Sequence, residues 1–339
     1  MSEHETVPFM DALNARACEA LANWDLGGQT PQLLKYRENA VFRITLKSGQ
    51  PAALRLHRPG YHDETALASE LCWMAALREA GLRVPAPVLT PDGRQIVSLA
   101  ATQALGDQHA DIVSWMTGAP LGQSGVPLAH SQERLAAIFH RLGEAMAQMH
   151  AATDAWMPPS SFSRPAWDDD GLLGENPLWG RFWDCPGLSP HDAERLSGLR
   201  QRLQKQLAKL AGLNVDYGLI HADLVRENVL VDGDHVELID FDDGGYGWRP
   251  FDIATALFKN RGEPHYKVIK SALIEGYRGV RPLPDSALET LPLFMVLRSL
   301  TYIGWIGERP DTPDAAERLQ RYVADALALA DAMQAGDTA

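Results

Sequence analysis

The sequence predicts an α+β chain of two lobes, a small lobe built on an antiparallel sheet and a larger, mostly helical lobe. Short strand-like segments follow one another between residues 31 and 116, whereas helical periodicity dominates after residue 131. The chain has 339 residues, and a single hydrophobic core rarely grows beyond about 250–300 residues. We therefore expect one lobe over 1–116 and a second over 117–339.

The first lobe is expected to open with a helix from Phe9 to Trp24, which Gly27 and Gly28 stop. The expected elements that follow are strands at 31–36, 40–46 and 51–57, a helix over 63–80 closed by Gly81, and strands at 86–90, 95–101 and 109–116. The segment KSGQ between the second and third strands is a hairpin signal. This order predicts a sheet with a helix inserted after its third strand.

The second lobe is expected to follow a linker, TGAPLGQSGVP, at 117–127. The expected helices lie at 131–151, 190–212, 251–260, 265–278, 287–307 and 312–334. Between the first two lies a segment that is too apolar for a linker, with four tryptophans, Trp156, Trp167, Trp179 and Trp183. This segment is interpreted either as an aromatic wall of a binding site or as a structural cap on the helices.

Composition narrows the class of protein. The net charge of −13 argues against a nucleic-acid partner or an anionic membrane surface, because both need clustered Lys and Arg. The three cysteines are widely spaced and form no metal-ligand motif, which indicates reduced thiols. The N-terminus has neither the basic start nor the apolar core of a signal peptide, and the chain shows no apolar run of about 18 residues. A soluble, cytoplasmic protein with no membrane partner is expected.

Chemistry is concentrated in the acid-rich segment HADLVRENVLVDGDHVELIDFDD at 221–243. Two strand-like stretches flank a turn signal at 232–234, and a hairpin centred near residue 234 places Asn228 roughly opposite Asp240. A carboxamide and a carboxylate are oxygen ligands that suit Mg²⁺, which usually shares its coordination with substrate phosphates. Asp223, in the preceding loop, is left to accept a proton. The segment therefore predicts phosphoryl transfer.

The pattern H-x-D-x-x-x-x-N followed by a strand-borne Asp resembles the aminoglycoside phosphotransferase/choline kinase superfamily. The stretch DDGGYGWRPFDIATAL is similar to the branch that holds homoserine kinases and bacterial stress-response Ser/Thr kinases. The resemblance covers about residues 30–305 and is strongest over 218–257. It implies a bilobal protein-kinase-like fold with a nucleotide-binding first lobe and a catalytic, acceptor-binding second lobe.

The resemblance also implies roles for individual residues. Asp223 matches the catalytic base, and His221 matches the histidine that keeps the loop in shape. Asn228 and Asp240 match the pair that holds Mg²⁺. Asp252 matches an aspartate that braces the catalytic loop from the following helix.

Residues for the nucleotide are expected in the first lobe. Helical spacing turns Glu70 inward, and Arg55 on the preceding strand is its expected cationic partner, where the family usually has Lys. Asn39 lies in YRENAVFR, which has no glycine and is expected to form the hairpin over the phosphates. Ser114 lies in DIVSWMTG, which is similar to the segment whose backbone holds adenine.

The function that the resemblance implies is transfer of a phosphate from ATP, with Mg²⁺, to a hydroxyl of a small molecule such as a homoserine- or choline-like amino alcohol. The segments SRPAWDDDGLLG and LRSLTYIGW lie where such kinases bind their acceptors, and Arg298 in the second is expected to meet an acceptor carboxylate.

Other hypotheses remain open at this point. A Ser/Thr protein kinase of the stress-response type would use the same loop on a protein hydroxyl. Asp240-Phe241-Asp242 also resembles the D-x-D of haloacid-dehalogenase-type phosphatases, and a non-catalytic nucleotide-binding protein is a further alternative. Asp242 and Asp243 are interpreted either as turn acids or as contacts to a second metal or the substrate.

Overall fold

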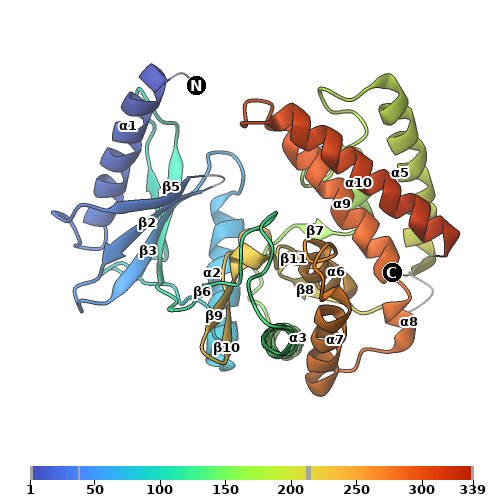
Figure 1. Ribbon diagram of the computed structural model, residues 1–339. Helices are drawn as coiled ribbons and strands as arrows, with labels where there is room; N and C mark the ends of the chain where they lie inside the picture. Colours follow the sequence, from blue (N-terminus) through green and yellow to red (C-terminus); the bar gives the residue numbers. More distant parts are fainter. Residues whose placement is uncertain (1–2, 37–38, 211–214, 337–339) are drawn as a thin grey trace. The chain divides into compact units, whose positions relative to one another are not determined.

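The computed structural model describes residues 3–36, 39–210 and 215–336 (Figure 1). The chain divides into two compact units, the first made of Met1–Gly118, Trp156–Arg164 and Glu237–Asp242, and the second of Ala119–Ala155, Pro165–Val236 and Asp243–Ala339. The boundary expected after Met116 lies close to the end of the first stretch, but the two later stretches of the first unit were not expected there. The α+β class, with an antiparallel sheet in the N-terminal part and a helical C-terminal part, is confirmed.

The first unit is built on an antiparallel five-stranded sheet with the order β1-β2-β3-β5-β4. Its elements are α1 (Glu3–Ala22), β1 (Gln32–Tyr36), β2 (Ala40–Thr45), β3 (Pro51–Leu56), α2 (Glu64–Glu79), β4 (Ile96–Leu99) and β5 (Gln108–Ser114). Buried side chains alternate with exposed ones along β2. Helix α1 lies beside the sheet (Figure 1), and Leu13 and Leu21 join a core cluster with Phe42, Leu54 and Ile112.

Two expectations for this unit need correction. The strand expected over 86–90 is absent: within that segment an isolated bridge joins Pro87 to Val113, and the Ala86 N–H donates to the Ser114 hydroxyl instead of to a backbone carbonyl of the ladder. The first helix begins at Glu3 and ends at Ala22, earlier than the sequence pattern indicated. Residues 37–38 of the expected phosphate hairpin lie outside the described residues.

The elements that follow β5 are mostly helical. They are β6 (Ala119–Pro120), α3 (Gln132–Ala155), β7 (Ala166–Trp167), α4 (Asp169–Leu173), α5 (Pro190–Leu210), β8 (Tyr217–Ile220), the 3₁₀ turn η1 (Arg226–Asn228), β9 (Val229–Asp232), β10 (His235–Leu238), β11 (Gly245–Trp248), α6 (Arg249–Phe258), α7 (Tyr266–Val280), α8 (Asp285–Leu288), α9 (Leu291–Gly307) and α10 (Ala315–Ala335). Two small sheets accompany these helices, with strand orders β10-β9-β6 and β7-β11-β8. The helices α3, α5, α6, α7, α9 and α10 agree with those expected from the periodicity, whereas the short helices α4 and α8 were not expected. The expected linker contributes β6.

Strand β11 was not anticipated, because two of its four residues are glycines. It pairs antiparallel with β8 and parallel with β7. A Cβ on Gly247 would lie 2.5 Å from Ile220 Cδ1, and one on Gly245 would lie 2.3 Å from the Pro165 carbonyl oxygen. The glycines therefore allow the close approach of neighbouring chain that the strand requires.

Helices α3 and α7 cross closely through two glycines. A Cβ on Gly143 would lie 2.1 Å from the Leu273 carbonyl oxygen, and one on Gly276 would lie 1.9 Å from the carbonyl oxygen of His140. Both distances are well below any normal contact, so these positions accept no side chain without a shift of the backbone. The crossing brings His150 of α3 and Tyr277 of α7 into hydrogen-bond distance, 2.9 Å.

One helical stretch among the described residues, Asp285–Gly307, is long and apolar enough to cross a membrane by length and composition alone. Of the window that meets this criterion, 78% is buried inside the protein. A core helix of a soluble protein has the same length and composition, and α9 fits that description because nearly all of its side chains are buried.

We expect Gly276→Ala to lower the free energy of unfolding by about 1–3 kcal/mol or more, because the added methyl group must displace the backbone of α3. Gly279→Ala is the matched control: it lies on the same helix with nothing within 4 Å of its added Cβ. It should be neutral or stabilise by up to about 1 kcal/mol. Urea unfolding of both variants measures the difference, and equal stabilities would contradict the packing described for this crossing.

Candidate active site

The loop after β8 is held by the carboxylate of Asp252, which lies in the first turn of α6. Asp252 accepts hydrogen bonds from the backbone N–H groups of His221, at 2.8 Å, and Ala222, at 2.7 Å. Ala222 has a φ of 64°, in the left-handed region that non-glycine residues seldom adopt. The brace predicted for Asp252 is therefore present, and it fixes an uncommon backbone conformation immediately before Asp223.

The Asp223 carboxylate is fixed at both of its oxygens. Oδ1 accepts a hydrogen bond from Nη2 of Arg298 at 2.5 Å, and Oδ2 accepts one from Nδ2 of Asn228 at 2.8 Å. Asn228 also donates to the backbone carbonyl of Asp223, at 2.9 Å. The Asp223 side chain is nevertheless 19% exposed. A carboxylate that is oriented from two sides and still reached by solvent has the geometry of a base for an incoming hydroxyl.

Two other side chains of the loop, those of His221 and Arg226, fix its shape. His221 is fully buried, and its Nδ1 faces the backbone N–H of Asp223 at 3.3 Å, which is the contact expected of a residue that shapes the loop. Arg226 donates to Asn260 at 2.9 Å and pairs with Glu263 at 2.5 Å. Because its guanidinium is engaged by these residues, the loop's own cation is not the one beside Asp223.

Asp252 is backed by a buried histidine. His150 Nε2 lies 3.0 Å from Asp252 Oδ2, and both side chains are inaccessible to solvent. Burial, together with the nearby cation of Arg249, lowers the pKa of His150 from 6.5 to about 4. Burial raises the pKa of Asp252, but hydrogen bonds and the charges of His150 and His221 outweigh it, so the net shift of its pKa is downward. The pair is therefore a neutral histidine and a carboxylate near neutral pH.

Asp240 belongs to the first unit and Asn228 to the second, so their expected pairing at one metal ion stays a prediction. Asp240 follows β10 with a φ of 69°, and its carboxylate lies 3.6 Å from the ammonium group of Lys35 on β1. The strand expected to reach Phe241 instead ends at Leu238. Asn228 uses its amide nitrogen on Asp223, which leaves its amide oxygen for a cation.

The side-chain oxygens of Asn228 and Asp240 are each of the donor type that a hard cation takes. No group of three or more His, Cys, Asp or Glu side chains that could hold a metal ion occurs within residues 3–36, 39–210 and 215–336. A protein-only metal cage is therefore not seen in that part of the chain. Such a donor set suits an ion that completes its coordination with phosphate oxygens and water.

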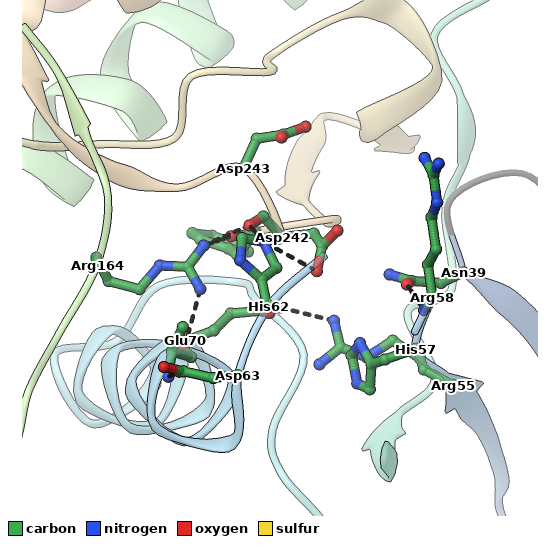
Figure 2. Close-up of polar contacts among 12 residues, drawn as sticks. Asn39, Arg55, His57, Arg58, His62, Asp63, Glu70, Arg164, Asp242 and Asp243 are labelled. Atoms are coloured by element: carbon green, nitrogen blue, oxygen red, sulfur yellow. Dashed lines mark hydrogen bonds and ion pairs between the residues drawn. The ribbon is translucent and has the colours of Figure 1, made fainter. Parts of the chain in front are cut away.

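The ion pair predicted between Arg55 and Glu70 is present, at 2.6 Å, and is buried (Figure 2). The guanidinium of Arg55 also makes a bidentate contact with Asp111, at 2.7 Å for each bond. Burial lowers the pKa of Arg55, but the charges of Asp111 and Glu70 outweigh it and raise the pKa well above its ordinary value. Arg55 is thus a permanent cation held by two acids, one on α2 and one on β5.

Asp111 and His57 were missed by sequence reasoning. Nε2 of His57 lies 2.7 Å from Asp111 Oδ2, and both side chains are buried. Burial raises the pKa of Asp111, but Arg55 and His57 outweigh this effect and hold the pKa well below its usual range. The available signal was a charged residue inside the apolar strand HADIVSW, which needs a buried partner.

Asn39 and Ser114 make local contacts that shape their segments. The side-chain oxygen of Asn39 accepts a hydrogen bond from the backbone N–H of Arg58 at 3.2 Å. The Ser114 hydroxyl accepts one from the Ala86 N–H at 2.9 Å, and the Ser114 N–H donates to the Ala86 carbonyl at 2.8 Å. Their proposed contacts with a nucleotide stay predictions.

The adjacent acids Asp242 and Asp243 fall into different units. Within the first unit, the carbonyl oxygen of Asp242 accepts hydrogen bonds from His62, at 2.9 Å, and from Arg164 (Figure 2). Within the second unit, the Asp243 carboxylate accepts a hydrogen bond from Trp179 Nε1 at 3.0 Å. The first contact is structural, whereas the second links an acid to the aromatic segment.

The tryptophan-rich segment has two kinds of member. Trp167 is buried and stacks on Phe251 at 5.5 Å between ring centroids, which is a core role. Trp179 is partly buried and lies under the guanidinium of Arg298, at 4.6 Å from its ring centroid. The structural alternative therefore applies to Trp167, and the aromatic wall of a binding site stays a prediction.

Arg298 differs from the expectation that it meets an acceptor carboxylate. It is fully buried and donates to Asp223, to the Ala222 carbonyl at 3.2 Å and to the Tyr302 hydroxyl at 3.0 Å. Because these groups of the protein itself engage the guanidinium, Arg298 is directed at the loop rather than at a ligand carboxylate.

Comparison with known families identifies the chain. Residues 31–283 match the phosphotransferase enzyme family. Since this match covers well over half of the 339 residues, the chain belongs to that family. The expected enzyme class, a phosphotransferase of the protein-kinase-like superfamily, is confirmed, and the phosphatase alternative drawn from Asp240-Phe241-Asp242 is wrong.

Three relatives are similar to the chain over most of its length. A solved microcompartment-associated aminopropanol kinase is 30% identical, with a TM-score of 0.80 over 95% of this chain and 98% of the other. Homoserine kinase of Rhizobium johnstonii is 29% identical over 289 residues, 80% of this chain and 78% of the relative. Amicoumacin kinase of Bacillus subtilis is 23% identical over 316 residues, 90% of this chain and 88% of the relative. These proteins show what the chain is similar to.

The lowered pKa of His150 predicts a dependence of stability on pH. The unfolded chain takes up a proton near pH 6.5, whereas the folded protein takes it up only near pH 4. The contribution of His150 to the free energy of unfolding is therefore fully present above pH 6.5. It is lost as the pH falls from 6.5 to about 4, and this group causes no further loss at lower pH. The loss amounts to roughly 3 kcal/mol. Urea unfolding between pH 4 and 7 measures it.

The control for this measurement is the exposed His235. His150→Gln should flatten the slope of stability against pH over that window, and His235→Gln should leave it unchanged. A slope that is the same in the wild type and in His150→Gln would show that another group causes the loss.

Proposed function

We propose that this enzyme transfers the γ-phosphate of ATP to a hydroxyl of a small molecule, with an amino alcohol of the homoserine or choline kind as acceptor. The observation that carries the proposal is the Asp223 carboxylate, oriented by Arg298 and Asn228 on a loop that Asp252 braces, and 19% exposed. In this role Asp223 orients the acceptor hydroxyl and takes its proton as the phosphorus–oxygen bond forms. Catalysis then rests mainly on positioning and on charge stabilisation.

The donor side is assigned to the first unit. Arg55, kept in place by Glu70 and Asp111, supplies positive charge for the phosphates, while Asn39 and Ser114 lie in the segments assigned to the phosphates and adenine. A divalent metal, Mg²⁺ in our proposal, would be held by the side-chain oxygens of Asn228 and Asp240. When bound, the metal neutralises phosphate charge. In support, a structure of an amicoumacin kinase contains AMP-PNP and Ca²⁺.

The acceptor is assigned to the second unit as a small molecule that carries an amine. The names of two similar proteins, aminopropanol kinase and homoserine kinase, both denote compounds with an amine and a hydroxyl. The Asp243 carboxylate, which accepts a hydrogen bond from Trp179 Nε1 at 3.0 Å, provides an acid of the kind that suits an ammonium group. A soluble protein in the cytoplasm agrees with this role. A Ser/Thr protein kinase is the alternative, and no contact described above favours it.

ADP release with ATP and Mg²⁺, measured across a panel of hydroxyl compounds, tests the proposal. The panel should hold aminopropanol, homoserine, choline and ethanolamine, the same carbon chains without the amine, and a generic Ser/Thr protein substrate. We expect turnover with an amino alcohol and little with its deaminated partner. Turnover with the protein substrate alone would support the alternative, and no ADP release or phosphorylated product under any condition would contradict the assignment of ATP as donor.

Asp223→Asn should lower kcat by about 10²–10⁴, because the carboxamide keeps the shape of the side chain but cannot accept the proton. ATP binding, measured by the rise in melting temperature with ATP and Mg²⁺, should remain largely intact. Asp234→Asn, at the exposed turn after β9, is the control and should keep wild-type turnover. An Asp223→Asn enzyme with unchanged kcat would rule out Asp223 as the base.

A further inference from the structure

The cation beside the proposed base comes from outside its loop. Between His221 and Asn228 the sequence HADLVREN offers only Arg226 as a positive side chain, and Arg226 is engaged by Asn260 and Glu263. Arg298 reaches Asp223 instead from α9, 75 residues further along the chain. The positive charge beside Asp223 is therefore supplied by α9 and not by the loop itself.

Arg298 is held from several directions, so its position is set by the fold. Its guanidinium lies over the rings of Trp179 and Tyr302, with its central carbon 4.6 Å from each centroid. Two of its hydrogen bonds go to the Ala222 carbonyl and the Tyr302 hydroxyl, which leaves the third for Asp223. A cation locked in this way directs one carboxylate oxygen and leaves little freedom for rotation of the side chain.

Burial makes the pair mutually dependent. Arg298 is 0% exposed, and a buried guanidinium is strongly destabilised unless an anion accompanies it. Among the described residues, Asp223 is the carboxylate that forms an ion pair with Arg298. The same contact fixes the direction of one oxygen of the Asp223 carboxylate, Oδ1.

We propose that Arg298 is the positioning residue of the catalytic base: from α9 it fixes the orientation of the Asp223 carboxylate toward the acceptor hydroxyl. This inference rests on the proposed function of Asp223. It replaces the expectation that Arg298 binds the acceptor, and it gives α9 a part in the chemical step rather than in acceptor recognition.

The test compares Arg298→Gln, Arg298→Lys and the control Arg318→Gln in steady-state phosphate transfer, with kcat and KM measured separately and folding checked by melting. Arg318 also lies over aromatic rings, those of Trp305 and Tyr322, and no ion pair joins it to Asp223. Arg298→Gln should lower kcat by about 10²–10³, with little change in KM for ATP. Arg298→Lys should recover part of kcat, and Arg318→Gln should behave as wild type.

Folded Arg298→Gln and Arg298→Lys enzymes with wild-type kcat would overturn the inference while leaving the proposed function intact. If Arg298→Gln does not fold, Arg298→Lys decides: a loss of about tenfold in kcat in a folded enzyme supports the inference, and wild-type kcat overturns it. A wild-type protein that transfers no phosphate to any hydroxyl overturns the proposed function, and this inference with it.

Discussion

The carboxylate of Asp252 makes the contact on which the catalytic loop depends. It accepts the N–H groups of two successive residues, His221 and Ala222, and so holds Ala222 in a left-handed conformation that costs an L-residue about 1–2 kcal/mol. Asp223 is the next residue, and its direction follows from the turn at Ala222. Without the two hydrogen bonds the backbone at Ala222 would favour a more common conformation, and the Asp223 side chain would point in another direction.

The brace in turn requires the packing of the second unit. A carboxylate that is completely buried needs hydrogen-bond donors on every side, and His150 supplies the donor that the loop does not. His150 lies on α3 and is itself contacted by Tyr277 of α7, so the close crossing of these two helices brings His150 and Tyr277 together. That crossing is possible because Gly143 and Gly276 carry no side chain. Residues far from the loop therefore determine whether the base is presented correctly.

Much of this arrangement could be predicted from sequence, because its residues lie at fixed spacings. The loop from His221 to Asn228 is one short segment, and helical spacing alone turned Glu70 toward Arg55. Arg298 and Asp111 could not be assigned in this way. A buried charge inside an apolar segment predicts that a partner exists, but which residue it is depends on how distant elements pack. Glycine-rich β11 was missed for a related reason, since its glycines serve close contact with neighbouring chain rather than strand propensity.

Hydrogen exchange at the backbone amides of His221 and Ala222, in the wild type and in Asp252→Asn, tests most directly whether Asp252 holds the loop. We expect the substitution to accelerate exchange at these two amides by about tenfold or more, since weakening a hydrogen bond by about 1.4 kcal/mol corresponds to that factor. Amides in β2 and β3 of the first unit should exchange as in the wild type. Unchanged protection at His221 and Ala222 would contradict the claim that Asp252 holds the loop and, through it, the base.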